Sequence, residues 1–88
     1  MSEKELERMF KAFADKRRLA IMRYVRKQGE APVGDIASEI KLSFNATSKH
    51  LLLLAAANIV DKEQRSLQMF YRITEELSPA ARKALNIL

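Results

Sequence analysis

The stretch that decides the fold is Leu42-Ser43-Phe44-Asn45-Ala46-Thr47-Ser48-Lys49-His50-Leu51. Ser43 is a good N-cap, because its hydroxyl can accept a hydrogen bond from a free amide of the first helical turn. After it, Thr47, Leu51 and Leu54 recur at spacings of four and three residues, as expected for one buried side of a helix. The sequence therefore indicates an amphipathic helix that begins near residue 44.

The opposite face of this helix is polar and carries no acidic side chain near its start. Asn45, Ser48 and Lys49 lie close to the helix N-terminus, where free amides and the helix dipole attract phosphate. Asparagine can bind adenine, and lysine can reach guanine or a phosphate, so this face suits the DNA major groove. Most surface helices also have a polar face that is merely solvated. The neighbouring segments must therefore show whether this face reads DNA or is only solvated.

Length and composition predict one small domain, residues 1–88, with a basic balance. The net charge is +5, which favours an anionic partner, above all nucleic acid. A surplus of Lys and Arg that only improves solubility would give the same net charge. No cysteine is present, which excludes disulfides and thiolate metal sites. The charged start and the lack of a long apolar run predict a cytoplasmic protein without a membrane span.

Catalysis has no recognisable basis in this sequence. His50 is the only histidine, Gly29 and Gly34 are the only glycines, and no glycine-rich phosphate loop is present. We therefore expect neither an enzyme nor a cofactor. A single histidine is also a poor metal site, because zinc sites in proteins use at least three protein ligands.

The residues before the decisive stretch predict three helices and a short extended segment. Ser2 and Glu5 form a capping box, Asp15 can cap a second helix, and Gly29 ends it. Pro32 biases its neighbourhood toward extended backbone. A short third helix follows from the helical spacing of Val33, Ile36, Ala37 and Ile40. A three-residue turn then links two short helices, which is a helix-turn-helix.

Strand formers follow the decisive helix, after Asn58, which can adopt the left-handed conformation that ends it. Residues 59–64 and 68–73 predict two strands around a turn at residues 65–67. Ser78 and Pro79 open a last helix. The predicted fold is mainly α with a small β-hairpin: a winged helix-turn-helix in the order helix, helix, strand, helix, helix, strand, strand, helix.

Four segments in this order resemble the ArsR family of transcriptional regulators. They are residues 10–19 (with Lys16 where a proline is usual), residues 33–37, the recognition helix and its exit (matching at residues 42–43, 47–51, 54 and 57–60), and residues 70–73. The resemblance implies a homodimeric repressor that binds double-stranded DNA. It implies that each recognition helix enters a major groove, and that the first and last helices pair across the two-fold axis. Family members often release DNA when a metal or another inducer binds.

The chain departs from the family pattern at two places. It has no cysteine, and its last helix has no histidine or acid, so we expect no metal sensing at the family's usual sites, and the inducer is unknown. Leu52, Ala55 and Ala56 stand where family members usually carry charged residues. This apolar surface either touches a partner or lies near DNA sugars and methyl groups.

The expected DNA contacts lie on the recognition helix and the wing. Phe44 could instead pack on the third helix, and Arg65 could belong to a solvated turn. His50 is expected either as a hydrogen-bonded residue at the helix edge or as a phosphate contact. The full set is Ser43, Phe44, Asn45, Ala46, Ser48, Lys49, His50, Lys62, Gln64 and Arg65.

Apolar residues of the first and last helices are the expected dimer contacts, unless the two helices pair within one subunit. They are Leu6, Met9, Phe10, Phe13, Leu77, Ala81, Ala84, Leu85 and Leu88. The predicted function is transcriptional regulation, as a homodimeric repressor on an inverted-repeat operator. The alternative is a winged helix used for protein–protein assembly without specific DNA binding.

Overall fold

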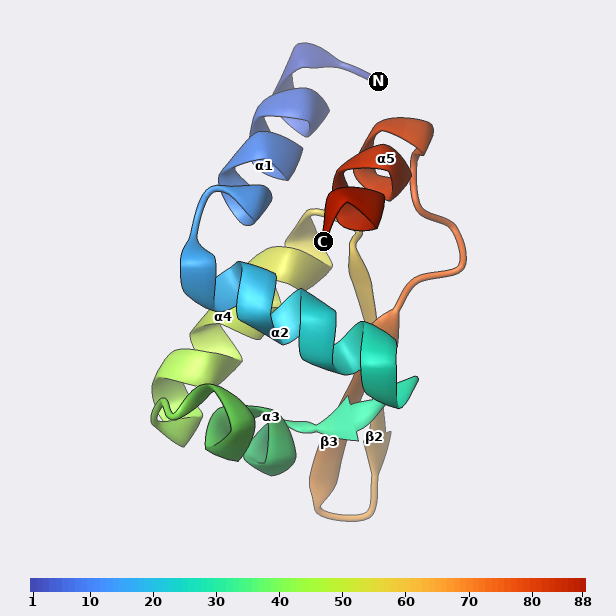
Figure 1. The fold of residues 1–88 in the computed structure, drawn as a ribbon. Helices are drawn as coiled ribbons and strands as arrows, with labels where there is room; N and C mark the ends of the chain where they lie inside the picture. Colours follow the sequence, from blue (N-terminus) through green and yellow to red (C-terminus); the bar gives the residue numbers. More distant parts are fainter.

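Eight elements follow the predicted order in the computed structural model, which describes residues 1–88 (Figure 1). They are α1 (Glu3–Phe13), α2 (Lys16–Gln28), β1 (Ala31–Pro32), α3 (Val33–Ile40), α4 (Phe44–Ala56), β2 (Val60–Arg65), β3 (Gln68–Ile73) and α5 (Pro79–Ile87). The prediction of a winged helix-turn-helix is confirmed.

Side-chain caps set the starts of every helix except α3, which begins after Pro32 without one. The Ser2 hydroxyl accepts from the Glu5 amide while the Glu5 carboxylate accepts from the Ser2 amide, which completes the predicted capping box. The Asp15 carboxylate accepts from the amides of Arg17 and Arg18 at the start of α2. Each cap provides partners for amides that have none within the helix, so local sequence alone fixes these boundaries.

The turn between α3 and α4 sets the orientation of the recognition helix. Lys41 adopts a left-handed conformation (φ 57°), and the Leu42 amide donates to the Ala37 carbonyl. Ser43 then caps α4 by accepting from the Ala46 amide. The Thr47 hydroxyl donates to the Ser43 carbonyl at 2.8 Å, which satisfies this buried polar group within its own helix.

The wing is an antiparallel sheet in the order β1-β3-β2. β2 begins and ends one residue later than the sequence predicted, and Arg65 pairs with Gln68 across a two-residue turn of Ser66 and Leu67. Arg65 is therefore a strand residue and not part of the tip. Ser66 has φ 56°, a conformation that glycine or asparagine adopts more readily. That mismatch is why the turn could not be read from its residues.

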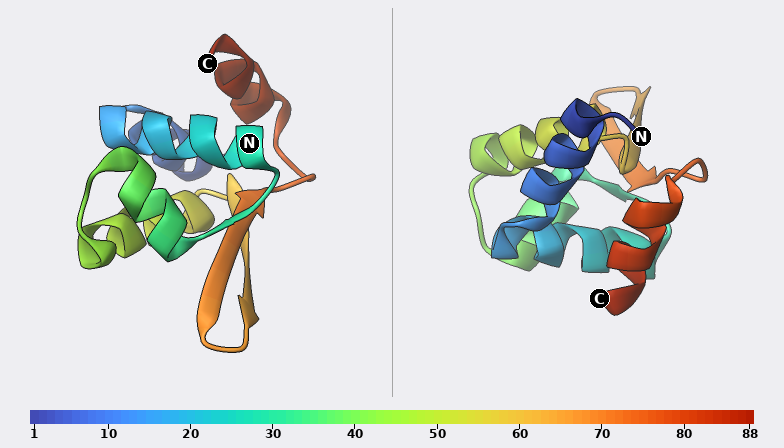
Figure 2. Two further views of the ribbon diagram at one scale, coloured as in Figure 1. Left: turned by 60° about the horizontal axis from the view of Figure 1, so that its bottom comes forward. Right: turned by 90° about the horizontal axis from the view of Figure 1, so that it is seen from above.

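One apolar core joins the helices to the sheet. Its fully buried members include Ile21 and Met22 of α2, Ile36 of α3 and Leu54 of α4. Figure 1 shows the wing tip and the start of α4 at one end of the molecule, and α1 and α5 at the other. The left view in Figure 2 also shows the hairpin projecting away from the two terminal helices. The surfaces expected to meet DNA and a second subunit are thus separate.

Candidate nucleic-acid interface

The start of α4 presents an accessible polar face. Asn45 and Lys49 are exposed, one turn apart, and Ser48 beside them is half-buried. Behind them the predicted inward stripe, Thr47 and Leu51 with Leu54, is fully buried. Because the stripe is locked into the core, the polar face has one fixed direction. Asn45 and Lys49 can therefore both approach the edges of bases in one groove.

Three further predicted contacts flank this face. The Ser43 hydroxyl is engaged as the N-cap of α4, although its residue is exposed. Ala46 is half-buried. Phe44 has 58% of its surface exposed, so it is not packed away against α3, and its ring is available at the helix N-terminus.

His50 lies at the edge of α4 and contacts α2. A guanidinium nitrogen (NH1) of Arg18 lies 3.3 Å from His50 Nδ1. Arg18 also donates through Nε to the Ala12 carbonyl at 3.0 Å and through NH2 to the Lys11 carbonyl at 2.6 Å. Sequence reasoning missed Arg18, because the contact joins residues 32 positions apart and leaves no local signal.

Asp15 completes the charged surroundings of Arg18. Its carboxylate lies 3.9 Å from a guanidinium nitrogen of Arg18. The hydrogen bond from the Arg18 backbone amide is the largest reason that the pKa of the Asp15 carboxyl lies below its ordinary value, with the Arg17 amide adding to it. Asp15 therefore caps α2 as an anion and balances the nearby guanidinium.

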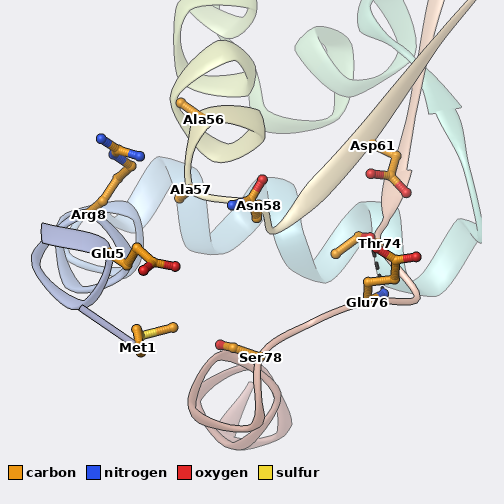
Figure 3. A pocket seen from close by; sticks show the side chains of 10 residues that line it. All are labelled: Met1, Glu5, Arg8, Ala56, Ala57, Asn58, Asp61, Thr74, Glu76 and Ser78. Carbon is orange, nitrogen blue, oxygen red and sulfur yellow. Dashed lines mark hydrogen bonds between the residues drawn. The ribbon is translucent and has the colours of Figure 1, made fainter. Parts of the chain in front are cut away.

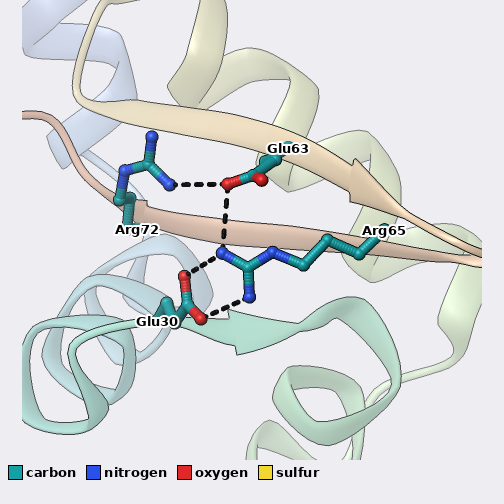
Figure 4. A network of polar contacts seen from close by, with 4 residues as sticks. All are labelled: Glu30, Glu63, Arg65 and Arg72. Carbon is teal, nitrogen blue, oxygen red and sulfur yellow. Dashed lines mark hydrogen bonds and ion pairs between the residues drawn. The ribbon is translucent and has the colours of Figure 1, made fainter.

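Arg65, predicted as a DNA contact at the wing tip, is engaged within the subunit (Figure 4). Its guanidinium forms a bidentate pair with Glu30 at 2.6 and 2.8 Å and reaches Glu63 at 3.0 Å. It also lies over the Phe70 ring, 4.6 Å from the ring centre. Arg72 joins Glu63 at 3.2 Å. The other predicted wing residues, Lys62 and Gln64, are exposed.

These ion pairs shift the acid–base behaviour of their members. The hydrogen bond from Arg65 is the first cause that holds the pKa of both Glu30 and Glu63 below the ordinary value. The two glutamates in turn raise the pKa of Arg65. The network ties the β2 edge to the segment between α2 and β1, so the wing is connected to the helical body by side chains as well as by β1.

An apolar surface continues along the second half of α4. Leu52 is 52% exposed, and Leu53 and Ala56 are exposed beside it. Ala55, predicted to share this surface, is half-buried against the core. The helix turns Ala55 inward because it lies one residue from Leu54 on the buried side. Leu53 was missed, since it lies within an unbroken run of leucines.

The terminal helices divide their apolar residues between the core and the surface. Four of the predicted dimer contacts are already buried within one subunit: Met9, Leu77, Ala81 and Leu85. Three are half-buried: Phe13, Ala84 and Leu88. Leu6 and Phe10 on α1 remain exposed, Phe10 by 59%. Ile87 of α5, which is not among the predicted dimer contacts, is exposed as well. The surface left for a partner is therefore smaller than predicted.

A cavity of about 400 Å³ lies between α1, the end of α4 and the segment before α5 (Figure 3). Glu5 and Arg8 line one wall, and Asp61 and Glu76 line another. It opens at the C-terminal end of α4, away from Asn45 and Lys49. No group of three or more His, Cys, Asp or Glu side chains is placed to hold a metal ion. None of the helices has the length and apolar character needed to cross a membrane.

Comparison with known proteins gives a consistent result. The family model described as "Bacterial regulatory protein, arsR family" matches residues 15–62, which run from the start of α2 into β2. The arsenical resistance operon repressor of Bacillus subtilis is 32% identical over 73 residues, covering 83% of this chain and 70% of the relative.

Solved structures match nearly the whole chain. NolR from Sinorhizobium fredii is 28% identical with a TM-score of 0.80, covering 96% of this chain and 80% of its own. Reduced HlyU from Vibrio cholerae is 27% identical with a TM-score of 0.80, and the match covers 97% of this chain and 85% of HlyU. A homodimeric winged helix-turn-helix DNA-binding domain from Mycobacterium bovis is 27% identical with a TM-score of 0.82, and the match covers 99% of this chain and 83% of that domain.

Proposed function

The chain belongs to the arsR family of bacterial regulatory proteins, and on that premise we propose that it is a DNA-binding transcriptional repressor that acts as a homodimer. The observation that carries the proposal is the exposed polar start of α4, with Asn45 and Lys49 opposite a fully buried stripe. As a bacterial regulator of transcription, the protein acts in the cytoplasm, where the chromosome lies. Its family is one of regulators, which is not an enzyme class.

DNA recognition divides between base contacts and phosphate contacts. Asn45 can make a bidentate contact to adenine, and Lys49 can reach guanine or a phosphate. Lys62 and Gln64 on the exposed β2 edge reach the phosphates beside the groove. Arg65 we place outside the primary contacts, because its guanidinium is occupied by Glu30 and Glu63.

Homodimerisation covers the apolar residues that one subunit leaves exposed on its terminal helices. Leu6, Phe10 and Ile87 are large, apolar and accessible. They lie on α1 and α5, at the end of the molecule opposite the wing tip (Figure 1). Two such subunits present two recognition helices, and a two-fold dimer therefore reads an inverted repeat. The Mycobacterium bovis domain is described as homodimeric, which supports the same arrangement here.

Titration of labelled duplex DNA at several salt concentrations tests this function. Each phosphate neutralised by the protein contributes roughly −0.9 to the slope of log affinity against log salt. We expect a steep negative slope, because the basic protein contacts several phosphates. We also expect the operator duplex to bind more tightly than an unrelated duplex of equal length. A slope near zero, or no binding to any duplex, would remove the proposal.

One observation favours a second function, protein–protein assembly. Leu52 and Leu53 form an exposed apolar patch with Ala56 on the outer side of α4. An assembly module would bind a protein partner through this patch without discriminating between DNA sequences. The variant Leu52→Lys separates the two functions. If the patch binds a protein partner, the variant should lose assembly. If α4 lies on DNA, the variant should retain or strengthen phosphate binding.

A further inference from the structure

The contact between Arg18 and His50 constrains which ring nitrogen of the histidine can carry a proton. A guanidinium has five N–H donors, no acceptor, and a permanent positive charge. Its nitrogen lies 3.3 Å from His50 Nδ1, so the imidazole must accept at Nδ1 to form this hydrogen bond. An imidazole that accepts at Nδ1 is neutral and carries its proton on Nε2. The contact therefore selects one of the two neutral tautomers.

The selected Nε2–H is left without a partner inside the protein. No hydrogen bond joins Nε2 to any other group of the chain, since the one contact of this side chain is through Nδ1. Every buried side-chain nitrogen or oxygen in the protein has a partner. His50 is a half-buried residue, so its unpartnered Nε2 must be open to solvent. The result is an accessible N–H donor directly after Lys49.

Arg18 is itself held rigidly. Its side chain is only 13% exposed, and it donates to the carbonyls of Lys11 and Ala12 at the C-terminal end of α1. Asp15, at the start of α2, lies 3.9 Å away and balances its charge. One side chain thus connects the end of α1, the start of α2 and the recognition helix. The imidazole is positioned by a group that cannot easily move.

From this juxtaposition we infer that Arg18 is a positioning residue, which holds His50 as the neutral Nε2–H tautomer so that it donates to a DNA backbone phosphate. The inference rests on the proposed function and adds a phosphate contact at the edge of the recognition helix. It also assigns a role to Arg18, which reaches DNA only through His50. The contact adds affinity by a hydrogen bond to an anion and contributes no positive charge of its own.

The single imidazole of the chain makes the tautomer directly measurable. Nitrogen-15 NMR of the histidine-labelled protein at a pH of about 8, where an ordinary imidazole is neutral, separates a protonated nitrogen from an unprotonated one. We expect a protonated Nε2 and an unprotonated Nδ1, with slower exchange of the Nε2 proton once operator DNA is bound. Arg18→Gln should lose this preference, whereas Arg17→Gln, an exposed neighbouring arginine, should keep it.

Binding measurements complete the test. His50→Ala should weaken operator binding about tenfold, the scale of a hydrogen bond to a charged group, with the salt slope unchanged. Lys49→Ala should instead reduce the size of that slope by about 0.9. A protonated Nδ1, or an His50→Ala variant that binds like the parent, overturns the inference while DNA binding stands. Failure of the parent to bind DNA overturns the proposed function itself.

Discussion

Asn45 and Lys49 contribute differently to DNA binding, although both are exposed on one face of α4. Lys49→Ala should weaken binding to every sequence, since it removes a charge next to phosphates. Asn45→Ala should relax the preference at one base pair, by about 1–3 kcal/mol if the contact is bidentate. Fluorescence anisotropy with operator variants measures both effects.

The matched control for Lys49→Ala is Lys83→Ala. Lys83 is exposed on α5, at the other end of the molecule, so the substitution removes the same charge away from the reading face. Equal losses of affinity in the two variants, or unchanged discrimination in Asn45→Ala, would mean that the reading face is assigned to the wrong residues.

At the scale of elements, the wing depends on Glu30. Glu30→Gln removes the carboxylate that forms the bidentate pair with Arg65, keeps the Arg65–Glu63 pair, and leaves the strand residues unchanged. We expect faster hydrogen exchange of the β2 and β3 amides, with little change in the helical core. Glu39→Gln is the control, because Glu39 is exposed on α3 and forms no ion pair. Equal exchange rates in all three proteins would show that backbone pairing alone holds the wing.

The same network predicts how the wing responds to acid. Because the folded pKa values of Glu30 and Glu63 lie below the unfolded value, their contribution to stability is complete above that value. It is lost as pH falls through the lower folded pKa values, below about 4.5. Wing protection should therefore decrease with acid in the parent protein. In Glu30→Gln this decrease should be smaller, as measured by hydrogen exchange across that pH range.

Local sequence predicted the elements well, for identifiable reasons. The caps at Ser2, Asp15, Ser43 and Ser78 act within three residues, so they can be read directly. The buried stripe of α4 follows from spacing alone.

Contacts between distant residues could not be read in this way. The pairs Arg18–His50 and Arg65–Glu30 join positions 32 and 35 residues apart. Nothing in the sequence indicated that Arg65 is occupied. For the same reason the apolar spacing of the last helix assigns Leu85 to a dimer surface, whereas the fold buries Leu85 within one subunit.

At the scale of the whole molecule, dimerisation and DNA binding should be lost together. Phe10→Asp places a carboxylate on the apolar surface of α1. Burying that charge in an interface is costly, yet a single subunit leaves position 10 exposed, so the fold is retained. Analytical ultracentrifugation should show a monomer, and operator affinity should fall with it.

The control for the dimer prediction is Lys4→Asp, an exposed change on the same helix. It should leave both the mass and the affinity of the protein close to those of the parent. A dimeric Phe10→Asp variant, or a monomeric variant that binds the operator as tightly as the parent, would contradict the assignment of α1 to the interface.

Metal ions should not regulate this protein. The chain has no cysteine and one histidine, and no three acidic or imidazole side chains converge in the structure. Zinc, nickel or copper added at one equivalent per subunit should leave operator affinity unchanged, because such ions need three or four well-placed ligands. Release of DNA by one tightly bound ion per subunit would contradict this prediction.

Selection of bound DNA from a random duplex pool tests the central claim most directly, because it requires both specific reading by α4 and a two-fold dimer. We predict enrichment of an inverted repeat whose half-sites lie about one helical turn apart, roughly 34 Å. We also expect Asn45→Ala to enrich a less restricted sequence at one position of each half-site. Recovery of no common sequence, or of a single unrepeated site by the parent protein, would contradict sequence-specific binding by a two-fold dimer.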